Sequence, residues 1–202
     1  MAYPEPVEAL IEAFERFPGI GRRSAERLSL HVLRDPRAAD LARSIERAVS
    51  STKRCKTCRN VAESDPCGIC SDETRDGTLV CVVEEPRHVE ALERAGVYRG
   101  RYHVLMGSFN PADGTEREQL GLGSLCKRVV EGGVKEVVLA LDPDAEGEAT
   151  SALVLTSLFE LEGEVPRVTR LARGLPAGSA IEYLHKGVLH DALEGRNEVR
   201  PA

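Results

Sequence analysis

Four cysteines within sixteen residues constrain this chain more than any other feature of its sequence. They form two Cys-x-x-Cys pairs, Cys55 with Cys58 and Cys67 with Cys70. Each pair can direct two thiolates at one point, and two facing pairs supply the tetrahedral sulfur set that Zn²⁺ accepts. Because all four ligands are Cys, no coordination position stays open for water, and the sequence predicts a structural zinc site. Two disulfides or a redox-active Cys-x-x-Cys are the alternatives.

The segment around these cysteines has almost no apolar residues of its own. Val61, Ala62 and Ile69 are too few to bury a core. Metal binding must therefore supply much of the free energy that folds this segment.

Size and composition indicate a globular protein. The chain has 202 residues, of which 42% are hydrophobic and 30% are charged. Its N-terminus lacks the basic start and apolar run of a signal peptide, and no stretch approaches the roughly 18 apolar residues of a membrane span. We therefore expect a cytoplasmic protein without a membrane partner.

Charge is distributed unevenly along the chain. Residues 1–60 hold 12 Lys and Arg against 8 Asp and Glu, a net charge of +4. Residues 61–202 hold 15 against 25, a net charge of −10. A basic N-terminal part on an acidic body is compatible with nucleic-acid binding, because phosphates respond to the local field.

The N-terminal part reads as a small unit of three helices. The spacing of apolar residues predicts helices over residues 4–17 and 22–33, joined by a tight turn. A third helix begins near Pro36 and carries an apolar stripe at helical spacing (Ala38, Leu41, Ile45 and Val49).

Beyond the cysteines, apolar β-rich runs alternate with helical segments. Strands are predicted at residues 78–83, 102–106, 136–141 and 167–171, with helices at 86–96, around 122–129 and at 146–161. This alternation predicts an α/β fold, a parallel sheet with helices on both faces. Cys81 and Cys126 lie in apolar surroundings and are interpreted as buried small hydrophobes. A short helix is expected near residues 188–195.

A glycine turn followed by arginines is the first candidate functional site. Gly19 and Gly21 would let the backbone approach a ligand, and the amides that begin the next helix would point at it. Arg22, Arg23 and Arg27 add positive charge nearby. This combination suits a nucleic-acid phosphate and carries no base information. The alternative is an ordinary helix joint with solvated arginines. The turn resembles the helix-hairpin-helix element of DNA repair proteins.

Acidic residues form the second candidate site. Glu84 closes the first predicted strand of the sheet, and Asp142, Asp144, Glu146 and Glu148 follow the third. Ligands of open parallel sheets gather at the carboxyl ends of strands, where these oxygens could hold Mg²⁺. The alternative is that they stabilise the start of the next helix. Residues 142–148 resemble the second motif of the Toprim domain, with Glu84 as the first.

In this order the pieces resemble the RecR family of bacterial recombination mediators over essentially the whole chain. Matching phrases include Phe17-Pro18-Gly19-Ile20-Gly21, Cys81-Val82-Val83-Glu84-Glu85 and Glu146-Gly147-Glu148-Ala149-Thr150. The resemblance implies a non-catalytic clamp, a homo-oligomeric ring of two or four subunits assembled through the N-terminal helices and the C-terminal part. Such a ring would bind double- and single-stranded DNA without sequence preference, with Arg23 and Arg27 inside it. The resemblance also implies nucleoid association and joint action with RecO and RecF, which loads recombinase onto gapped single-stranded DNA.

The domains expected from this resemblance are a helix-hairpin-helix unit over residues 1–53, a four-cysteine zinc finger over 54–71, a Toprim domain over 78–174 and an assembly segment over 175–202.

Two departures from the family pattern leave alternatives open. Family members usually have Asn-Pro-Thr or a similar triplet where this chain has Asp142-Pro143-Asp144. A Mg²⁺-dependent Toprim nuclease or primase-like enzyme that uses Glu84, Asp142 and Asp144 is therefore the second interpretation, and a protein-interaction scaffold is a third. The segment from Tyr183 to Leu189 also lacks the acidic residue and Thr typical of the family, which bears on assembly.

Overall fold

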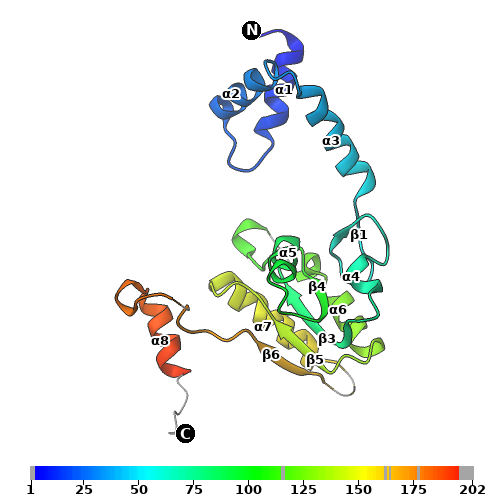
Figure 1. The fold of residues 1–202 in the computed structure, drawn as a ribbon, viewed down its shortest axis with the longest axis vertical. Helices are drawn as coiled ribbons and strands as arrows, with labels where there is room; N and C mark the ends of the chain where they lie inside the picture. The colour runs from blue at the N-terminus through cyan, green and yellow to red at the C-terminus, as the bar shows by residue number, and fades with distance from the viewer. Residues whose placement is uncertain (1–2, 115–116, 162, 164, 177, 196–202) are drawn as a thin grey trace. The chain divides into compact units, whose positions relative to one another are not determined.

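The computed structural model describes residues 3–114, 117–161, 163, 165–176 and 178–195. The chain divides into two compact units, with the boundary between Thr52 and Lys53, and each is described by itself (Figure 1). None of the described helices combines the length and apolar character that crossing a bilayer requires.

The N-terminal unit is built on a pair of packed helices. Helix α1 (Glu5–Glu15) and helix α2 (Arg22–Val32) lie against each other. Ile11 of α1 and Ala25 of α2 are fully buried between them. The two helices thus confirm the predicted hairpin of helices, with ends within two residues of the predicted ones.

Helix α3 (Ala38–Ser51) differs from the expectation of a packed three-helix unit. The structure describes every residue of α3, and none of them is buried. Its predicted apolar stripe faces outward, with Leu41, Ile45 and Val49 46%, 56% and 77% exposed. The periodicity predicted the helix correctly, but a stripe is covered only where a neighbouring surface meets it.

The second unit holds a four-stranded parallel sheet in the order β4-β3-β5-β6. Its strands are β3 (Asp76–Val83), β4 (Gly100–Val104), β5 (Glu136–Leu139) and β6 (Arg167–Arg170). Its helices are α5 (Pro86–Ala95), α6 (Leu122–Glu131) and α7 (Ala145–Phe159). Short 3₁₀ helices occupy Pro111–Asp113, Arg117–Leu120 and Ile181–Tyr183, and α8 (Lys186–Glu194) follows the last of them.

The central strand β3 is buried on both faces, as its continuous apolar run predicts. Val80 and Val82 pack with residues of α6 and α7 on one side. Cys81 and Val83 pack with Val89 of α5 on the other. Helices therefore cover both faces of the sheet, which confirms the predicted α/β fold.

The two cysteines outside the metal cluster differ in burial. Cys81 is 2% exposed, and burial raises the pKa of its thiol to about 12. Cys126 is only half-buried, and its thiol faces the carbonyl of Ser157 in α7 at 3.5 Å. Cys81 thus matches its interpretation as a buried hydrophobe, and Cys126 does so only in part.

Candidate metal centres and nucleic-acid interface

The four predicted zinc ligands converge on one point. Cys55, Cys58, Cys67 and Cys70 are all buried, and their Sγ atoms lie within 4.8 Å of one another. Cys58 Sγ and Cys67 Sγ are 3.5 Å apart. Tetrahedral coordination with Zn–S bonds of about 2.3 Å requires sulfur–sulfur distances of about 3.8 Å. The cluster therefore fits Zn²⁺, and all six cysteines of the chain are free of disulfides.

Local backbone geometry and charge explain how these sulfurs meet. The first pair lies in the connection between the antiparallel strands β1 (Lys53–Arg54) and β2 (Val61–Ala62), and α4 (Gly68–Ser71) carries Cys70 of the second. The Cys67 amide donates to Cys55 Sγ at 3.4 Å. Hydrogen bonding with Cys70 and burial raise the pKa of the Cys58 thiol. Four thiolates at this distance need a cation between them, which Zn²⁺ supplies.

The cysteine segment is attached to the parallel sheet by polar contacts. The Val104 amide of β4 donates to the Cys58 carbonyl at 2.8 Å. The Arg59 guanidinium donates to the Gln119 carbonyl at 3.2 Å. Burial lowers the pKa of Arg128 in α6, and the nearby cysteines oppose that shift because their negative charge stabilises the guanidinium. Arg128 thus offsets part of the charge of the sulfur cluster.

The glycine turn joins α1 to α2 in a conformation that its residues explain. Gly19 has a φ of +74°, in the left-handed region that favours glycine. Gly21 precedes α2 with extended backbone, and no side chain caps the helix start. Nothing lies within 4 Å of a Cβ added at either glycine. The turn therefore leaves room for a ligand beside its glycines, and no side chain occupies the start of α2, as an anion site requires.

Arg22 is an exposed residue bound by three carboxylates of the N-terminal unit. Its guanidinium contacts Glu8 at 2.5 and 2.9 Å, Glu15 at 3.3 Å and Glu26 at 3.2 Å. The hydrogen bond between Glu8 and Arg22 lowers the pKa of the Glu8 carboxyl and raises the pKa of the Arg22 guanidinium. The structure thus adds a second role for this predicted DNA contact: Arg22 ties α1 to α2, and its charge is balanced locally.

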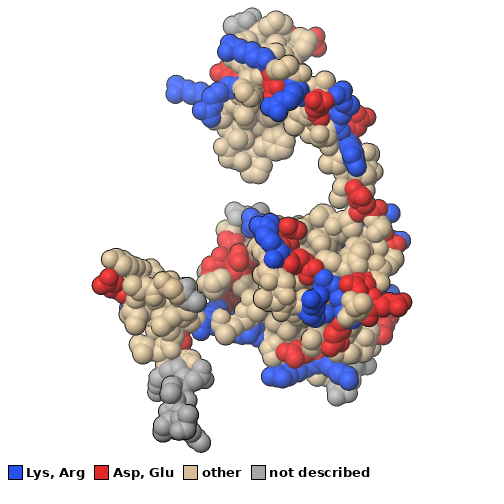
Figure 2. Space-filling model, in the orientation of Figure 1, with Lys and Arg blue, Asp and Glu red and all other residues tan. Residues whose placement is uncertain are grey.

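Arg23 and Arg27 lie four residues apart on the exposed side of α2. In the part of the chain that the structure describes, neither has a carboxylate partner, in contrast to Arg22. Figure 2 shows Lys and Arg side chains gathered over α2 and along α3. A groove on this unit is lined by Arg23, Arg27 and Arg34, together with Tyr3, Glu26, Leu30 and His31. Arg34 was not predicted from the sequence, although it follows Arg27 at a helical spacing of seven.

The carboxyl ends of β3 and β5 form the second site. From β3 the chain crosses to β4 on one side, whereas β5 pairs with β3 on the other. Ligands of open α/β sheets bind at such a switch point. Glu84 follows β3 directly, and its carbonyl accepts the Met106 amide at 2.8 Å and the Gly107 amide at 3.0 Å. The backbone at Glu84 is therefore anchored beside Asp142, which follows β5.

Glu84 and Asp142 come together there with a histidine. One ligand atom from each of Glu84, His88 and Asp142 lies within 4.8 Å of the others. His88 Nε2 is 3.9 Å from Asp142 Oδ2. His88 was not predicted as a site residue from the sequence, although it follows Glu84 by only four residues.

The remaining predicted carboxylates have other partners. Asp144 caps α7, accepting the Gly147 amide at 2.8 Å, which is the helix-start role considered as the alternative. Glu146 accepts hydrogen bonds from Ser108 at 3.0 Å and Asn110 at 2.8 Å. A Cβ added at Gly147 would come within 1.9 Å of the Asp142 carbonyl, so only glycine allows α7 to start this close to Asp142.

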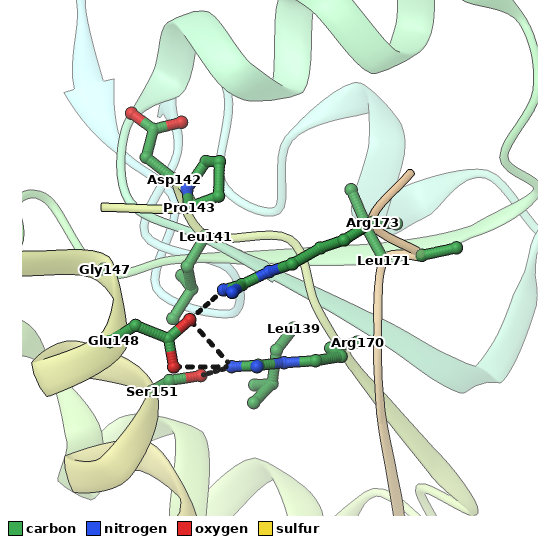
Figure 3. Close-up of a pocket in the computed structure, with 11 residues that line it drawn as sticks. Leu139, Leu141, Asp142, Pro143, Gly147, Glu148, Ser151, Arg170, Leu171 and Arg173 are labelled. Carbon is green, nitrogen blue, oxygen red and sulfur yellow. Dashed lines mark hydrogen bonds and ion pairs between the residues drawn. The ribbon is translucent and has the colours of Figure 1, made fainter. Parts of the chain in front are cut away.

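Glu148 faces a neighbouring pocket, shown in Figure 3. Its carboxylate binds Arg170 at 3.2 Å and also contacts Arg173. Arg170 reaches Ser151 of α7 at 3.3 Å as well. In this view the Asp142 carboxylate points away from the two guanidinium groups. Glu148 therefore links α7 to the segment after β6.

Glu84 has a buried carboxyl with a shifted pKa. It is 5% exposed, and burial raises its pKa to about 7, with further raising by the negative charges of Asp142 and Asp144. Among the residues that the structure describes, none donates a hydrogen bond to its Oε1 atom. A buried carboxylate oxygen without a donor is costly unless it is protonated or meets a cation.

Three family models match successive parts of the chain. A RecR helix-hairpin-helix model covers residues 7–49, a RecR four-cysteine zinc finger model covers residues 52–72, and a Toprim model covers residues 78–172. The zinc-finger match and the sulfur geometry together support a structural zinc ion at the four cysteines, as predicted.

Full-length relatives agree with these matches. A recombination protein RecR from Moorella thermoacetica is 47% identical over 201 residues, covering 98% of this chain and all of that protein. One from Pelotomaculum thermopropionicum is 46% identical over 98% of both chains. The chain belongs to the RecR family. The predicted family and fold are thus confirmed.

Zinc loss is expected to unfold the cysteine segment without dissolving the sheet. Cys67→Ser leaves three sulfurs, and a structural zinc site of this kind contributes on the order of 10 kcal/mol to folding. We expect loss of the zinc ion and faster hydrogen exchange at residues 53–72 and at the Val104 amide, with protection retained at β3 and β5. Zinc analysis and hydrogen-exchange mass spectrometry measure both. Cys126→Ser is the control and keeps its zinc; full zinc occupancy in Cys67→Ser would contradict the assignment.

The two glycines of the turn are expected to differ in their tolerance of alanine. Gly19→Ala places a side chain at positive φ, which costs about 1–2 kcal/mol. Gly21→Ala has ordinary backbone angles and open space, so a change within about 0.5 kcal/mol is expected. Chemical denaturation of both variants checks this difference, and equal stability of the two would refute it.

The raised pKa of Glu84 predicts a pH-dependent stability difference. An acid whose folded pKa of about 7 exceeds the ordinary 4.5 favours folding below pH 4.5, and this contribution is lost as the pH rises through 7. Glu84→Gln stays neutral, so its stability relative to wild type is expected to increase between about pH 5 and about pH 8. Thermal melts at both pH values test this, with Glu90→Gln on α5 as the control. A difference that does not grow with pH contradicts the prediction.

Proposed function

We propose that this chain is a DNA-binding recombination mediator that acts in DNA repair. The observation that carries the proposal is the pair Arg23 and Arg27, exposed without carboxylate partners among the described residues, beside the uncapped start of α2. Charged side chains and helix amides together bind phosphates, and they give affinity without base specificity. The relatives named recombination protein RecR support the same role.

In this proposal DNA of either form, double- or single-stranded, is bound through its backbone by Gly19, Gly21, Arg22, Arg23 and Arg27. Arg22 contributes less than the other two arginines, because its charge is already balanced by Glu8, Glu15 and Glu26.

We further propose that the chain assembles into a dimeric or tetrameric ring. The exposed stripe of α3 (Leu41, Ile45 and Val49) and apolar residues of the C-terminal segment (Ile181, Tyr183 and Leu193) supply surfaces that association would cover. The ring is non-catalytic and cytoplasmic, associates with the nucleoid, and acts with RecO and RecF to load recombinase onto gapped single-stranded DNA. These finer points rest on the family resemblance. The acidic second unit suits a basic partner, for which surface charges mainly set association rate and specificity.

The double variant Arg23→Ala with Arg27→Ala tests the DNA proposal. We expect weaker binding to all DNA sequences alike. Because two phosphate contacts are lost, the slope of log affinity against log salt concentration should decrease in magnitude by about two. Fluorescence anisotropy at several salt concentrations measures both quantities.

The matched control is Arg94→Ala with Arg167→Ala, which removes two arginines that are each 76% exposed on the second unit. Equal effects of the two double variants would mean that only net charge matters. Unchanged affinity in Arg23→Ala with Arg27→Ala would favour the scaffold interpretation instead.

The proximity of Glu84 to Asp142 favours a second candidate function, a Mg²⁺-dependent nuclease or primase-like enzyme. These two carboxylates and Asp144 would hold Mg²⁺, which would stabilise charge on a phosphodiester. Incubation with Mg²⁺ or Mn²⁺ and nicked, gapped or single-stranded DNA tests it. Under the mediator proposal we expect no cleavage; cleavage that Asp142→Asn abolishes would establish the enzyme.

A further inference from the structure

We propose that Glu84, His88 and Asp142 form a second metal site, separate from the zinc cluster, that binds a divalent first-row transition metal such as Mn²⁺ in preference to Mg²⁺. A Toprim site is expected to bind its metal ion through carboxylates alone. Here the ligand set also includes an imidazole nitrogen of His88. The inference concerns metal choice and holds whether or not the chain cleaves DNA.

Three elements of the sheet unit set the position of the three ligands. Glu84 directly follows β3, and His88 lies in the first turn of α5, where its amide donates to the Glu85 carbonyl at 3.0 Å. Pro86 begins that helix and restricts the connection between them. Asp142 comes from the end of the neighbouring strand β5. The pairwise distances of up to 4.8 Å are close to the separations of about 3.0–4.3 Å between ligands that bind one ion at about 2.1 Å.

The buried oxygen of Glu84 points independently to a cation. Its side chain is nine-tenths buried or more, and Oε1 has no hydrogen-bond donor among the described residues. The same carboxylate contributes an oxygen to the three-ligand group. A metal ion there satisfies an atom that the protein itself leaves without a partner.

The donor set decides which ions fit. Mg²⁺ prefers six oxygens and keeps much of its water, whereas imidazole suits later first-row ions and Mn²⁺ accepts both carboxylate and nitrogen. Two carboxylates also balance the charge of a divalent ion, and Asp144 lies close enough for its charge to act on Glu84.

One neighbouring cation opposes binding. Arg87 Nε lies 3.4 Å from His88 Nε2, and it is also 3.1 Å from Glu85 Oε2. The Arg87 side chain is 70% exposed and can stay paired with Glu85 when His88 turns to a metal ion. Removing this charge should therefore strengthen metal binding, which gives the test a variant with the opposite sign.

The experiment uses the full chain with its zinc retained. Mn²⁺ is added and its free concentration is followed by electron paramagnetic resonance, with Mg²⁺ as competitor. We expect one Mn²⁺ per chain, a decrease in affinity of at least about tenfold in His88→Ala, Glu84→Gln and Asp142→Asn, and tighter binding in Arg87→Ala. His190→Ala is the matched histidine control and binds as wild type does.

A substitution that exchanges nitrogen for oxygen tests the selectivity. His88→Asp should keep a metal site but let Mg²⁺ compete at least about tenfold better against Mn²⁺. Zinc content and melting temperature show that each variant is folded. Absence of Mn²⁺ binding to the wild type, equal competition by Mg²⁺, or unchanged affinity in His88→Ala would overturn the proposal. Loss of DNA binding in the Arg23 and Arg27 variants would leave it unaffected.

Discussion

Burial of β3 on both faces is the constraint on which the second unit depends. Val80 and Val82 fill the core under α6 and α7, while Cys81 and Val83 fill the core under α5. A strand packed in this way cannot shift by one residue without exchanging its two faces. The register with β4 and β5 is therefore strongly specified, and the point at which β3 ends is specified with it. This packing therefore also fixes the position of Glu84, the residue that follows β3.

The cysteine segment relies on a different source of stability. It has too little apolar surface for a hydrophobic core, so the free energy of binding a metal ion to four sulfurs stabilises the fold of this segment instead. It is attached to the sheet by polar contacts of the Cys58 carbonyl and Arg59, and Ile69 packs against the apolar core on one face of the sheet. Arg128, a half-buried residue of α6, places a positive charge near the sulfurs and so opposes their negative charge. Metal binding and docking on β4 thus support each other.

At the N-terminal unit, some features of Arg22, Arg23 and Arg27 were predictable from the sequence and others were not. The glycine turn, both helices and the exposed side carrying Arg23 and Arg27 were predictable from spacing alone. The pairing of Arg22 was not, because Glu8 and Glu15 belong to α1 and meet Arg22 only when the two helices pack. The outward-facing stripe of α3 was missed for a related reason, since periodicity describes a helix and says nothing about what covers it.

Features that depend on residues near in sequence were thus determined by the sequence itself: the sulfur ligand set, the succession of strands and helices, and the alternation of core positions along β3. Tertiary structure alone decided which of the acidic residues would meet. It brought Glu84 to Asp142 and added His88, but turned Glu148 toward Arg170 and Arg173. The physical reason is that a charged group is positioned by the strand ends and helix faces around it. Those neighbours come from distant parts of the chain and become adjacent only when the sheet forms.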